Sequence, residues 1–434
     1  MAKPIISRDF GGRTGIDFTG GDGNYILSGL GGTACLWLGN GDNTVTVWGQ
    51  GNFIHLGSGR NTVDASAGTG NDIIGGDGDT TVLAGSGTAC VQLGNGNDRV
   101  TAWGNGNFIH LGQGKNTVDA GAGTGNDIIG GDGDTTVLAG SGTACVQLGS
   151  GNDHITAWGN GNFIQLGSGR NSVDASAGTG NDIIGGGGDT TVLAGHGTAC
   201  VRLGNGNDHV TAWGNGNFIH LGQGANTVDA SAGTGNDIIG GNGNTIVLAG
   251  QGTACVTLGD GNDTVVAGGQ GNYIHLGQGR NHVDAHTGTG NDIIGGNGDT
   301  TVLGGSGADV TLGDGRDTVV LDGLWNTIVL GHGADRVVAG AGQDTVRLGG
   351  PFAVTFRGSG NALQLTSLSS GSITGLAAGD FIELTQPVLA TLAPDHIALT
   401  RSGVSGETDI ALLAFTGHAI ALSTYDGITI LAVT

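Results

Sequence analysis

The stretch GNGNDRVTAW GNGNFIHL GQGKNTVDA GAGTGNDIIG GDGDTTVLA GSGTACVQL runs from Gly94 to Leu148 and decides the fold. Each of its six pieces is a Gly-x-Gly turn followed by a short run in which apolar and polar residues alternate. Alternation with a period of two is typical of a β-strand that buries one face. This density of Gly excludes a helix, because each Gly in a helix interior costs about 1 kcal/mol relative to Ala.

The whole 55-residue stretch is itself a repeat. The motif GTGNDIIGG begins at Gly68, Gly123, Gly178, Gly233 and Gly288. The same spacing separates Cys35, Cys90, Cys145, Cys200 and Cys255, and also Trp48, Trp103, Trp158 and Trp213. One short strand cannot bury its apolar side alone, whereas stacked laps of chain can, with backbone hydrogen bonds joining laps about 4.8 Å apart.

We therefore expect an all-β fold, a right-handed parallel β-solenoid over residues 20–350. Residues 1–19 would form an N-terminal cap, and residues 351–434, where Gly becomes rarer, a C-terminal β-rich cap. The strands expected in that cap are Phe381–Leu384, His396–Thr400, Asp409–Phe415 and Gly427–Val433. Such a cap closes the open end that a solenoid otherwise exposes.

The number of strands in a lap is the open question. The six pieces could form three laps of two strands or two laps of three. The two ten-residue pieces, beginning at Gly94 and Gly121, lie three pieces apart, and both carry Asn-Asp before an aliphatic residue. This favours a three-sided lap over a two-sided one. The positions expected to point inward are Val100, Ile109, Val118, Ile129, Val137 and Val146.

Composition excludes several classes of protein. The chain has 434 residues with 96 Gly but only 4 Pro, so it is not collagen, and its 37% hydrophobic content argues against disorder. A net charge of -23 disfavours nucleic acid as a partner, because phosphate contacts need Lys and Arg. No run of 18 apolar residues could span a membrane. The first residues lack the apolar core of a signal peptide, so export would use another route.

The pieces resemble the nonapeptide Gly-Gly-x-Gly-x-Asp-x-aliphatic-x of RTX (repeats-in-toxin) proteins. The segments Leu93–Thr101 and Ala122–Gly130 match it at every position but the first Gly. The resemblance implies a two-sided β-roll whose turns bind Ca²⁺, and uncleaved export from a Gram-negative cell by the type I secretion apparatus. It also implies an extracellular or cell-surface location. AAGDFIEL, from Ala377 to Leu384, resembles the C-terminal regions of such secreted proteins.

Calcium is the expected cofactor, held at the turns by carboxylates and carbonyl oxygens. A three-sided lap would align the Asp residues on one corner of successive laps. The expected ligands are Asp72, Asp98, Asp127, Asp153, Asp182, Asp208, Asp237, Asp263, Asp292, Asp317, Asp335 and Asp344. The resemblance is incomplete, since other turns carry Asn116, Thr135 or Ala144 at the Asp position. In the alternative interpretation, Asn and Asp cap backbone N–H groups between laps without any ion.

Other recurring residues are expected on the outside. His55, His110, His220 and His275 recur in FIHL or YIHL and are expected to face solvent, too far apart to share a metal. The cysteines are expected to stay unpaired, because a disulfide needs Cα atoms within about 7 Å. Ile128, Leu138 and Cys145 are expected to form outward apolar rows, which favour self-association of the protein, laterally or end to end.

The favoured function is that of a secreted, calcium-binding structural protein of a matrix, surface layer or filament, without enzymatic activity. One alternative is a polysaccharide-modifying β-helix enzyme, which would need a unique cluster of acids and bases that interrupts the repeat. Another is ice binding, which would need a Thr row on every lap, whereas Thr69 and Thr124 recur only every 55 residues.

Overall fold

The computed structural model describes residues 3, 5–386, 389–392, 396–402, 408–415, 420–425 and 428–433. All secondary structure in these residues is β-strand, turn or bend. Contacts divide the chain into two compact units, Met1–Leu221 and Gly222–Thr434. Each unit is a parallel β-solenoid, which confirms the expected fold class, and each is described here by itself.

Unit 1 (Met1–Leu221) alternates between two parallel sheets. Sheet A contains β1 (Ile5–Arg13), β3 (Asn24–Leu30), β5 (Thr44–Val47), β7 (Asn61–Asp64), β9 (Thr80–Leu83), β11 (Arg99–Thr101), β13 (Asn116–Asp119), β15 (Thr135–Leu138), β17 (His154–Thr156), β19 (Asn171–Asp174), β21 (Thr190–Leu193) and β23 (His209–Thr211). Sheet B contains β2 (Ile16–Thr19), β4 (Ala34–Trp37), β6 (Phe53–His55), β8 (Asp72–Ile74), β10 (Cys90–Gln92), β12 (Phe108–His110), β14 (Asp127–Ile129), β16 (Cys145–Gln147), β18 (Phe163–Gln165), β20 (Asp182–Ile184), β22 (Cys200–Arg202) and β24 (Phe218–His220).

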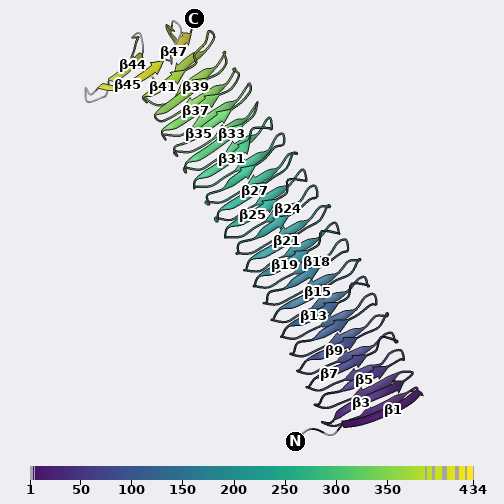
Figure 1. The fold of residues 1–434 in the computed structure, drawn as a ribbon. Helices are drawn as coiled ribbons and strands as arrows, with labels where there is room; N and C mark the ends of the chain where they lie inside the picture. Colours follow the sequence, from purple (N-terminus) through teal and green to yellow (C-terminus); the bar gives the residue numbers. More distant parts are fainter. Residues whose placement is uncertain are drawn as a thin grey trace. The chain divides into compact units, whose positions relative to one another are not determined.

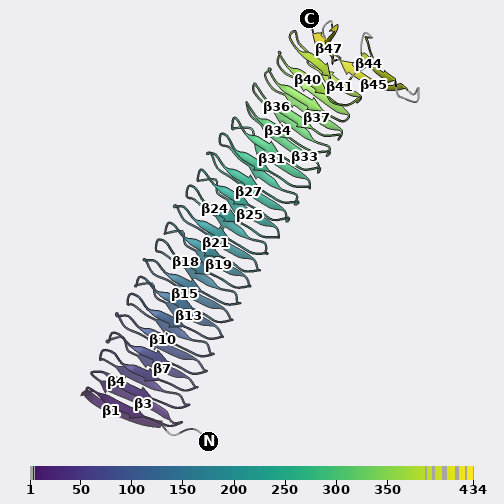
Figure 2. The same ribbon diagram turned by 180° about the vertical axis from the view of Figure 1, so that it is seen from behind.

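Each lap contains two strands, one from each sheet. Every strand pairs in parallel with the next strand but one, so that Val91 of β10 lies opposite Ile73 of β8 and Ile109 of β12 (Figure 1, Figure 2). Successive inward residues Val91, Ile109, Ile128 and Val146 are paired neighbours, so the 55-residue repeat is three laps of 18, 19 and 18 residues. The expectation of three strands per lap is therefore wrong.

The physical reason lies in the turns. Val100 pairs with Val82 and Val118, not with an aliphatic residue three pieces away. The length differences among the pieces are absorbed in the turns, while the strands keep strict register. Piece length consequently carries no information on how many strands form a lap. The expected right-handed sense of the solenoid stays a prediction.

Unit 2 (Gly222–Thr434) repeats this plan. Its sheet A strands are β25 (Asn226–Asp229), β27 (Thr245–Leu248), β29 (Thr264–Val266), β31 (Asn281–Ala285), β33 (Thr300–Gly304), β35 (Thr318–Leu321), β37 (Asp335–Ala339), β39 (Phe352–Phe356) and β41 (Gly371–Thr374). Its sheet B strands are β26 (Asp237–Ile239), β28 (Cys255–Thr257), β30 (Tyr273–His275), β32 (Asp292–Ile294), β34 (Asp309–Thr311), β36 (Thr327–Leu330), β38 (Thr345–Leu348), β40 (Ala362–Leu365) and β42 (Phe381–Leu384).

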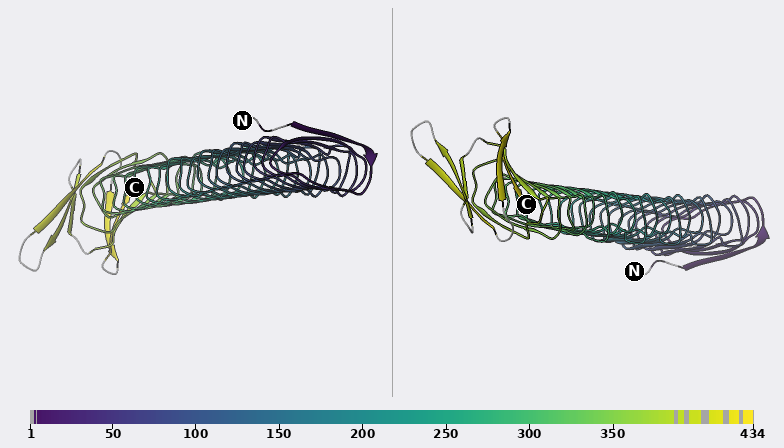
Figure 3. Two further views of the ribbon diagram at one scale, coloured as in Figure 1. Left: turned by 90° about the horizontal axis from the view of Figure 1, so that it is seen from below. Right: turned by 90° about the horizontal axis from the view of Figure 1, so that it is seen from above.

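The C-terminal strands leave this pattern. They are β43 (Leu389–Leu392), β44 (His396–Ser402), β45 (Thr408–Phe415), β46 (Ile420–Tyr425) and β47 (Ile428–Val433). β44 pairs antiparallel with β43 and β45, and β47 pairs antiparallel with β42 and β46, so the strands of this end turn away from the stacked laps (Figure 3). The expected C-terminal strands are confirmed, except that Gly427 lies outside the described residues. Parallel pairing continues past residue 350 as far as β42, and residues 5–19 already form the first strands.

The core is a thin double layer of aliphatic side chains. In unit 1, sheet A contributes a column that is mostly Val, such as Val82, Val100 and Val118, and sheet B one that is mostly Ile, such as Ile54 and Ile109, all 0% exposed. Each such side chain stabilises the fold by about 1.5–3 kcal/mol when fully buried. The inward prediction is confirmed for five of the six positions named. It is wrong for Ile129, because the buried residue of β14 is Ile128.

Glycine is required where the turns stack. Gly114 has φ +127°, and a Cβ there would stand 2.0 Å from the carbonyl oxygen of Gly96 on the preceding lap. Neither the backbone conformation nor the space permits a side chain at this position.

Deletions that respect the lap should be tolerated, and deletions that do not should disrupt the fold. Removing residues 121–175 takes out three whole laps and joins Ala120 to Ser176, which keeps every column in register. Removing residues 121–148 takes out half of the repeat and places a sheet A strand where sheet B must continue. We expect the first deletion to melt cooperatively within a few degrees of the full chain, because stability in a solenoid is a sum over neighbouring repeats.

The second deletion should lose the cooperative transition. Circular dichroism melting of both proteins is the measurement. Equal melts for the two deletions would contradict the two-strand lap.

Candidate functional site

Corner A is the turn that precedes each sheet A strand. Two residues before each inward Val or Ile, a polar side chain points into the lap and is at most 2% exposed in unit 1. This column reads Asn43, Asn61, Thr80, Asp98, Asn116, Thr135, Asp153, Asn171, Thr190 and Asp208. Its Asn and Asp members accept a backbone N–H from the preceding lap: Thr80 N donates to Asp98 Oδ1 at 2.9 Å, and Asp98 N donates to Asn116 Oδ1 at 2.9 Å.

Corner B is the turn that precedes each sheet B strand, and it carries an amide ladder. Ala89 N donates to Asn107 Oδ1 at 3.0 Å, and Asn107 Nδ2 donates to Asn126 Oδ1 at 2.9 Å. The same contacts recur at Ala144, Asn162 and Asn181. At both corners, therefore, side chains satisfy backbone donors that lie between laps, as the ion-free interpretation of the sequence proposes.

The twelve Asp residues expected on one corner occupy two kinds of position. Seven point inward and are buried: Asp98, Asp153, Asp208, Asp263, Asp317 and Asp335 at corner A, and Asp344 at corner B. Five begin sheet B strands and face outward, partly exposed: Asp72, Asp127, Asp182, Asp237 and Asp292. The expectation of a single ladder is wrong.

A shift of one residue explains this division. In NDRV, Asp98 lies two residues before the inward Val100, whereas in NDII it is Asn126 that lies two residues before the inward Ile128. Asp127 is thus equivalent to Arg99, because a one-residue shift moves a side chain to the other face of a strand. The sequence signal that locates the buried column is the position two before the buried aliphatic, and not the Asn-Asp pair.

The buried carboxylates carry an oxygen without a partner. Among the described residues, Oδ2 has no hydrogen-bond partner in Asp98, Asp153, Asp263, Asp317, Asp335 and Asp344. Burial raises the pKa of Asp98 to about 6, although the N–H of Thr80 favours the ionised form, and Asp79 adds a further rise. Burial likewise raises the pKa of Asp153, Asp208, Asp263 and Asp335 to about 6 and that of Asp317 to about 7.

Asparagine in the same column shows what the orphan oxygen lacks. Asn116 Nδ2 donates to the carbonyl of Gly112 in its own turn at 3.1 Å, and Asn171 Nδ2 donates to Gly167 at 3.1 Å. Asp98 has the same shape but no donor at that position. Its Oδ2 needs either a proton or a cation to face the turn carbonyls favourably.

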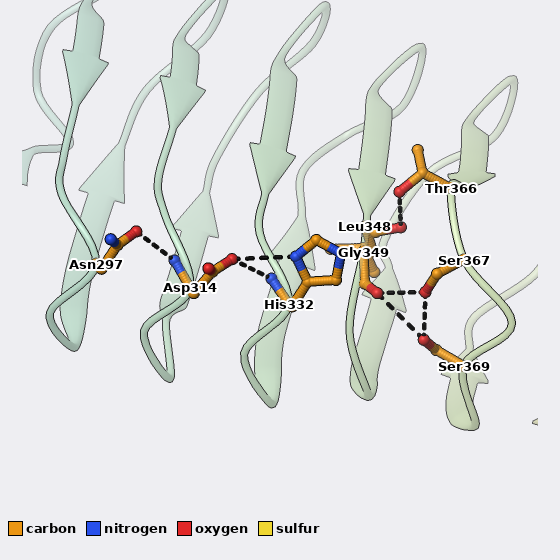
Figure 4. Close-up of polar contacts among 8 residues, drawn as sticks. All are labelled: Asn297, Asp314, His332, Leu348, Gly349, Thr366, Ser367 and Ser369. Atoms are coloured by element: carbon orange, nitrogen blue, oxygen red, sulfur yellow. Dashed lines mark hydrogen bonds and ion pairs between the residues drawn. The ribbon is translucent and has the colours of Figure 1, made fainter.

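Exposed turn residues form a second, solvent-facing ladder at corner A. Asp314 N donates to Asn297 Oδ1 at 3.1 Å, and His332 donates to Asp314 Oδ1 through N at 2.8 Å and lies 3.2 Å from it through Nδ1 (Figure 4). The N–H of His332 is the largest cause of a lowered pKa for Asp314. The ladder ends at Gly349, whose carbonyl instead accepts the hydroxyls of Ser367 and Ser369.

The outer face of sheet B repeats Asp, Cys and an aromatic residue on successive laps. Cys90 pairs with Asp72 on one side and Phe108 on the other, and Cys145 with Asp127 and Phe163. All five cysteines are free and partly exposed, as expected. Burial first, and then the neighbouring carboxylate, raises the pKa of the Cys90 thiol. These cysteines therefore stay protonated at neutral pH and are weak nucleophiles.

The outward apolar row expected from Ile128, Leu138 and Cys145 does not exist as one surface. Ile128 is buried, Leu138 lies on sheet A, and Cys145 lies on sheet B. On sheet A, Leu138 shares its outward column with Asp119 and Thr156, so the column reads Thr, Asp, Leu. The recurring histidines do face outward, as His55 and His110 do on sheet B.

Comparisons with known proteins identify no relative: no family model, no curated protein and no solved structure matches the chain. Within the described residues, no group of three or more His, Cys, Asp or Glu side chains is placed to hold a metal ion. No helix long and apolar enough to cross a membrane is found in the described part of the chain.

The buried carboxylates predict that the fold is more stable in mild acid than at neutral pH. A raised pKa in the folded state means that stability is fully present below the unfolded value near 4 and falls as pH rises to the folded value of about 6 to 7. Each group contributes about 1–3 kcal/mol, at 1.36 kcal/mol per pKa unit. In chelator, the melting temperature should therefore be higher at pH 5 than at pH 8.

Thermal melts at constant ionic strength between pH 4 and pH 8 measure this effect. A melting temperature that rises steadily over that range would contradict the prediction.

Proposed function

We propose that this chain is a secreted, calcium-binding structural protein of the extracellular space, without enzymatic activity. The observation that supports this most is the identical presentation of the same side chains every three laps. The outward face of sheet B repeats Asp, Cys, aromatic, and that of sheet A repeats Thr, Asp, Leu. A surface that repeats in this way suits a matrix, a surface layer or a filament, where each copy of a weak contact adds avidity.

An enzyme would need a place where the repeat is broken by a cluster of acids and bases. The acids on the page recur in register, and each buried one accepts a backbone N–H. The irregular turn at Leu324 and Trp325 carries no His, and its nearest acid, Asp322, is paired with Arg357 at 2.9 Å. A structural role is therefore favoured over catalysis.

An ice-binding surface is also less favoured. The first outward column of sheet A does carry Thr on many laps, which the 55-residue recurrence of Thr in the sequence conceals. Thr62 and Thr81 are paired neighbours, as are Thr117 and Thr136. Arg99 and His154 interrupt the column every third lap, so the regular hydroxyl row that ice would require is not formed.

Calcium would be held by the inward carboxylates. The orphan Oδ2 of Asp98, Asp153 and their equivalents is a hard oxygen ligand, and the carbonyls of the same Gly-x-Gly turn would supply further oxygens. When bound, the ion would neutralise a buried charge and take the place of the amide donor that Asn116 has. The outward Asp72 and Asp127 lack such surroundings and are not proposed as ligands.

Asparagine substitution tests this proposal. Replacing Asp98, Asp153, Asp263, Asp317, Asp335 and Asp344 by Asn should raise the melting temperature in chelator at pH 8, because each change removes a buried charge and adds a donor, worth about 1–3 kcal/mol. Millimolar Ca²⁺ should raise the melting temperature of the unmodified protein by several degrees and leave the sixfold variant unchanged. Mg²⁺ should do less, because it demands tighter octahedral geometry.

A matched control replaces the outward Asp72, Asp127, Asp182, Asp237 and Asp292 by Asn. This variant should respond to Ca²⁺ as the unmodified protein does. Identical melts of the unmodified protein in chelator and in Ca²⁺ would refute the calcium site.

Self-association is the proposed assembly mode, with the type I secretion apparatus as the transient partner that reads residues 409–434 during export. Leu83, Leu138 and Leu193 are partly exposed at the same place in the sheet A column of unit 1, and Leu248 occupies the equivalent place in unit 2. The net charge of -23 opposes contact between copies. Salt or Ca²⁺ should therefore strengthen association by screening that repulsion.

Replacing Leu83, Leu138, Leu193 and Leu248 together by Asp should abolish assembly while leaving the fold intact, because these side chains face outward. Light scattering measures assembly in Ca²⁺, and circular dichroism reports the fold. As a control, Val82→Asp on the buried face should unfold its neighbourhood instead. A monomeric unmodified protein at high concentration in Ca²⁺ would end the proposal of assembly.

A further inference from the structure

All six tryptophans of the chain lie on the surface. Their exposed fractions range from 37% for Trp213 to 68% for Trp325. Tryptophan is usually among the more buried residues, so a protein that exposes every one uses them for contact. Four of them, Trp48, Trp103, Trp158 and Trp213, recur every 55 residues within unit 1. We name these four the tryptophan row.

The row runs along corner B, immediately after the sheet A strands. Trp103 N donates to Gly85 O at 3.0 Å, and Trp158 N donates to Gly140 O at 3.1 Å, so each indole starts from the same place in its lap. Three laps separate neighbouring indoles, which corresponds to about 14 Å at about 4.8 Å per lap. Between the indoles the corner carries small residues only, as in Ala65–Gly68 and Gly85–Gly87.

Each ring lies along the corner. The Trp158 ring extends over the preceding lap and comes within 3.3 Å of the position that a Cβ on Gly121 would take. Because the ring is 48% exposed, one face rests on the protein while the other faces solvent. An indole held flat in this way is a platform on which a flat, partly apolar ligand can stack.

Polar groups that donate and accept hydrogen bonds flank each platform. Two residues after Trp103, the Asn105 side chain is exposed, and its Oδ1 accepts from Thr124 N at 2.9 Å and Thr124 Oγ1 at 3.1 Å. Asn160 makes the same contacts with Thr179. Fixing the oxygen in this way orients the amide NH₂ of each Asn toward solvent as a donor.

At Trp48 the surface is hollowed. A cleft of about 580 Å³ is lined by Trp48, Gln50, Thr33 and Thr14, with glycines forming its floor. This volume lies within the range of small-molecule sites, about 300–1,000 Å³. The cleft combines one aromatic wall with hydroxyl and amide groups.

We propose that the tryptophan row binds a linear, uncharged polysaccharide. A sugar ring has an apolar C–H face that stacks on an indole and equatorial hydroxyls that pair with Asn, Gln and Thr. A ligand that repeats matches a site that repeats, because each further ring binds intramolecularly once the first is bound.

Charge selects against acidic glycans. From Thr14 to Leu221, corner B carries no Lys or Arg. Asp64, Asp119 and Asp174 stand at the end of the adjoining sheet A strands, where each accepts an N–H from its own chain. An anionic polymer would therefore meet repulsion along the whole row.

A protein partner fits the row less well. Stable protein interfaces bury a continuous patch of about 1,200 Å² or more, with further apolar or Arg anchors. Here the indoles are separated by Gly, Ala and Ser.

The test uses the full chain and a panel of named polymers: a soluble β-1,3/1,4-glucan, dextran and mannan as neutral probes, and alginate as the anionic probe. Tryptophan fluorescence and affinity electrophoresis in polymer-containing gels measure binding. We expect retardation by at least one neutral polymer, an affinity that rises with its chain length, and no retardation by alginate.

The variant W48A/W103A/W158A/W213A should lose at least tenfold in affinity for the polymer that binds. Its melting temperature should remain unchanged, because the replaced rings lie on the surface. Trp37→Ala is the matched control, since Trp37 is 43% exposed but lies on sheet B, beside Phe53 and His55 with ring centroids 5.1 and 4.8 Å away. This control should bind as the unmodified protein does.

Three outcomes would overturn the proposal: no neutral polymer of the panel binds, the fourfold variant binds as well as the unmodified protein, or alginate binds better than the neutral polymers. Light scattering adds a fourth. If the unmodified protein self-associates and the fourfold variant does not, the row is a contact between copies of this chain and not a glycan site.

Discussion

The structure depends on how backbone N–H groups are satisfied where the chain turns from one sheet to the other. Within the strands, neighbouring laps pair as in any parallel sheet. At the corners, the chain runs between the sheets, and a buried N–H without an acceptor would cost about 1–3 kcal/mol. Asn, placed two residues before the buried aliphatic, supplies that acceptor and also donates from its amide, as Asn107 does to Asn126. The corner ladders thus hold each lap at one height and one register relative to the next.

Glycine and the thin core follow from the same stacking. Turns that lie directly over one another leave no room for a Cβ at positions such as Gly114. Close stacking of the turns brings the two sheets near enough for a single Val column and a single Ile column to fill the interior. Aromatic side chains do not fit that layer, and in the regular laps Phe108 and Trp103 therefore lie at the surface. The exposed indoles of corner B are in this sense a consequence of the fold, which the proposed glycan surface would exploit.

The amino-acid sequence predicts the class of fold well because its two signals, Gly-x-Gly and alternation, report local constraints that every lap obeys. It predicts the lap poorly. Whether Val100 neighbours Val118 or Ile128 depends on how the chain closes in space, and piece length does not encode that. The expected ligand set failed for a related reason. Asp98 and Asp127 follow the same Asn in sequence, but one extra turn residue sends Asp98 inward and Asp127 outward. The exposure of the tryptophans could not be inferred, because a spacing of 55 residues fits a buried column as well as a surface row.

The threefold chemical period also explains why the buried carboxylates are tolerable. In the regular part of each unit, only one lap in three has Asp at corner A, and the laps between carry Asn or Thr. Neighbouring carboxylates such as Asp98 and Asp153 are therefore about 14 Å apart, at about 4.8 Å per lap. That separation exceeds the Debye length of about 10 Å at 0.1 M salt, so each ionises almost independently of the next. Near residue 317 the spacing is broken: Asp317 and Asp335 occupy successive laps, and Asp317 N donates to Asp335 Oδ1 at 3.0 Å. There the second carboxylate adds its repulsion to burial, and Asp317 has the highest pKa of the column, about 7. The contrast between the two arrangements shows that lap spacing, and not burial alone, sets how readily a corner carries charge.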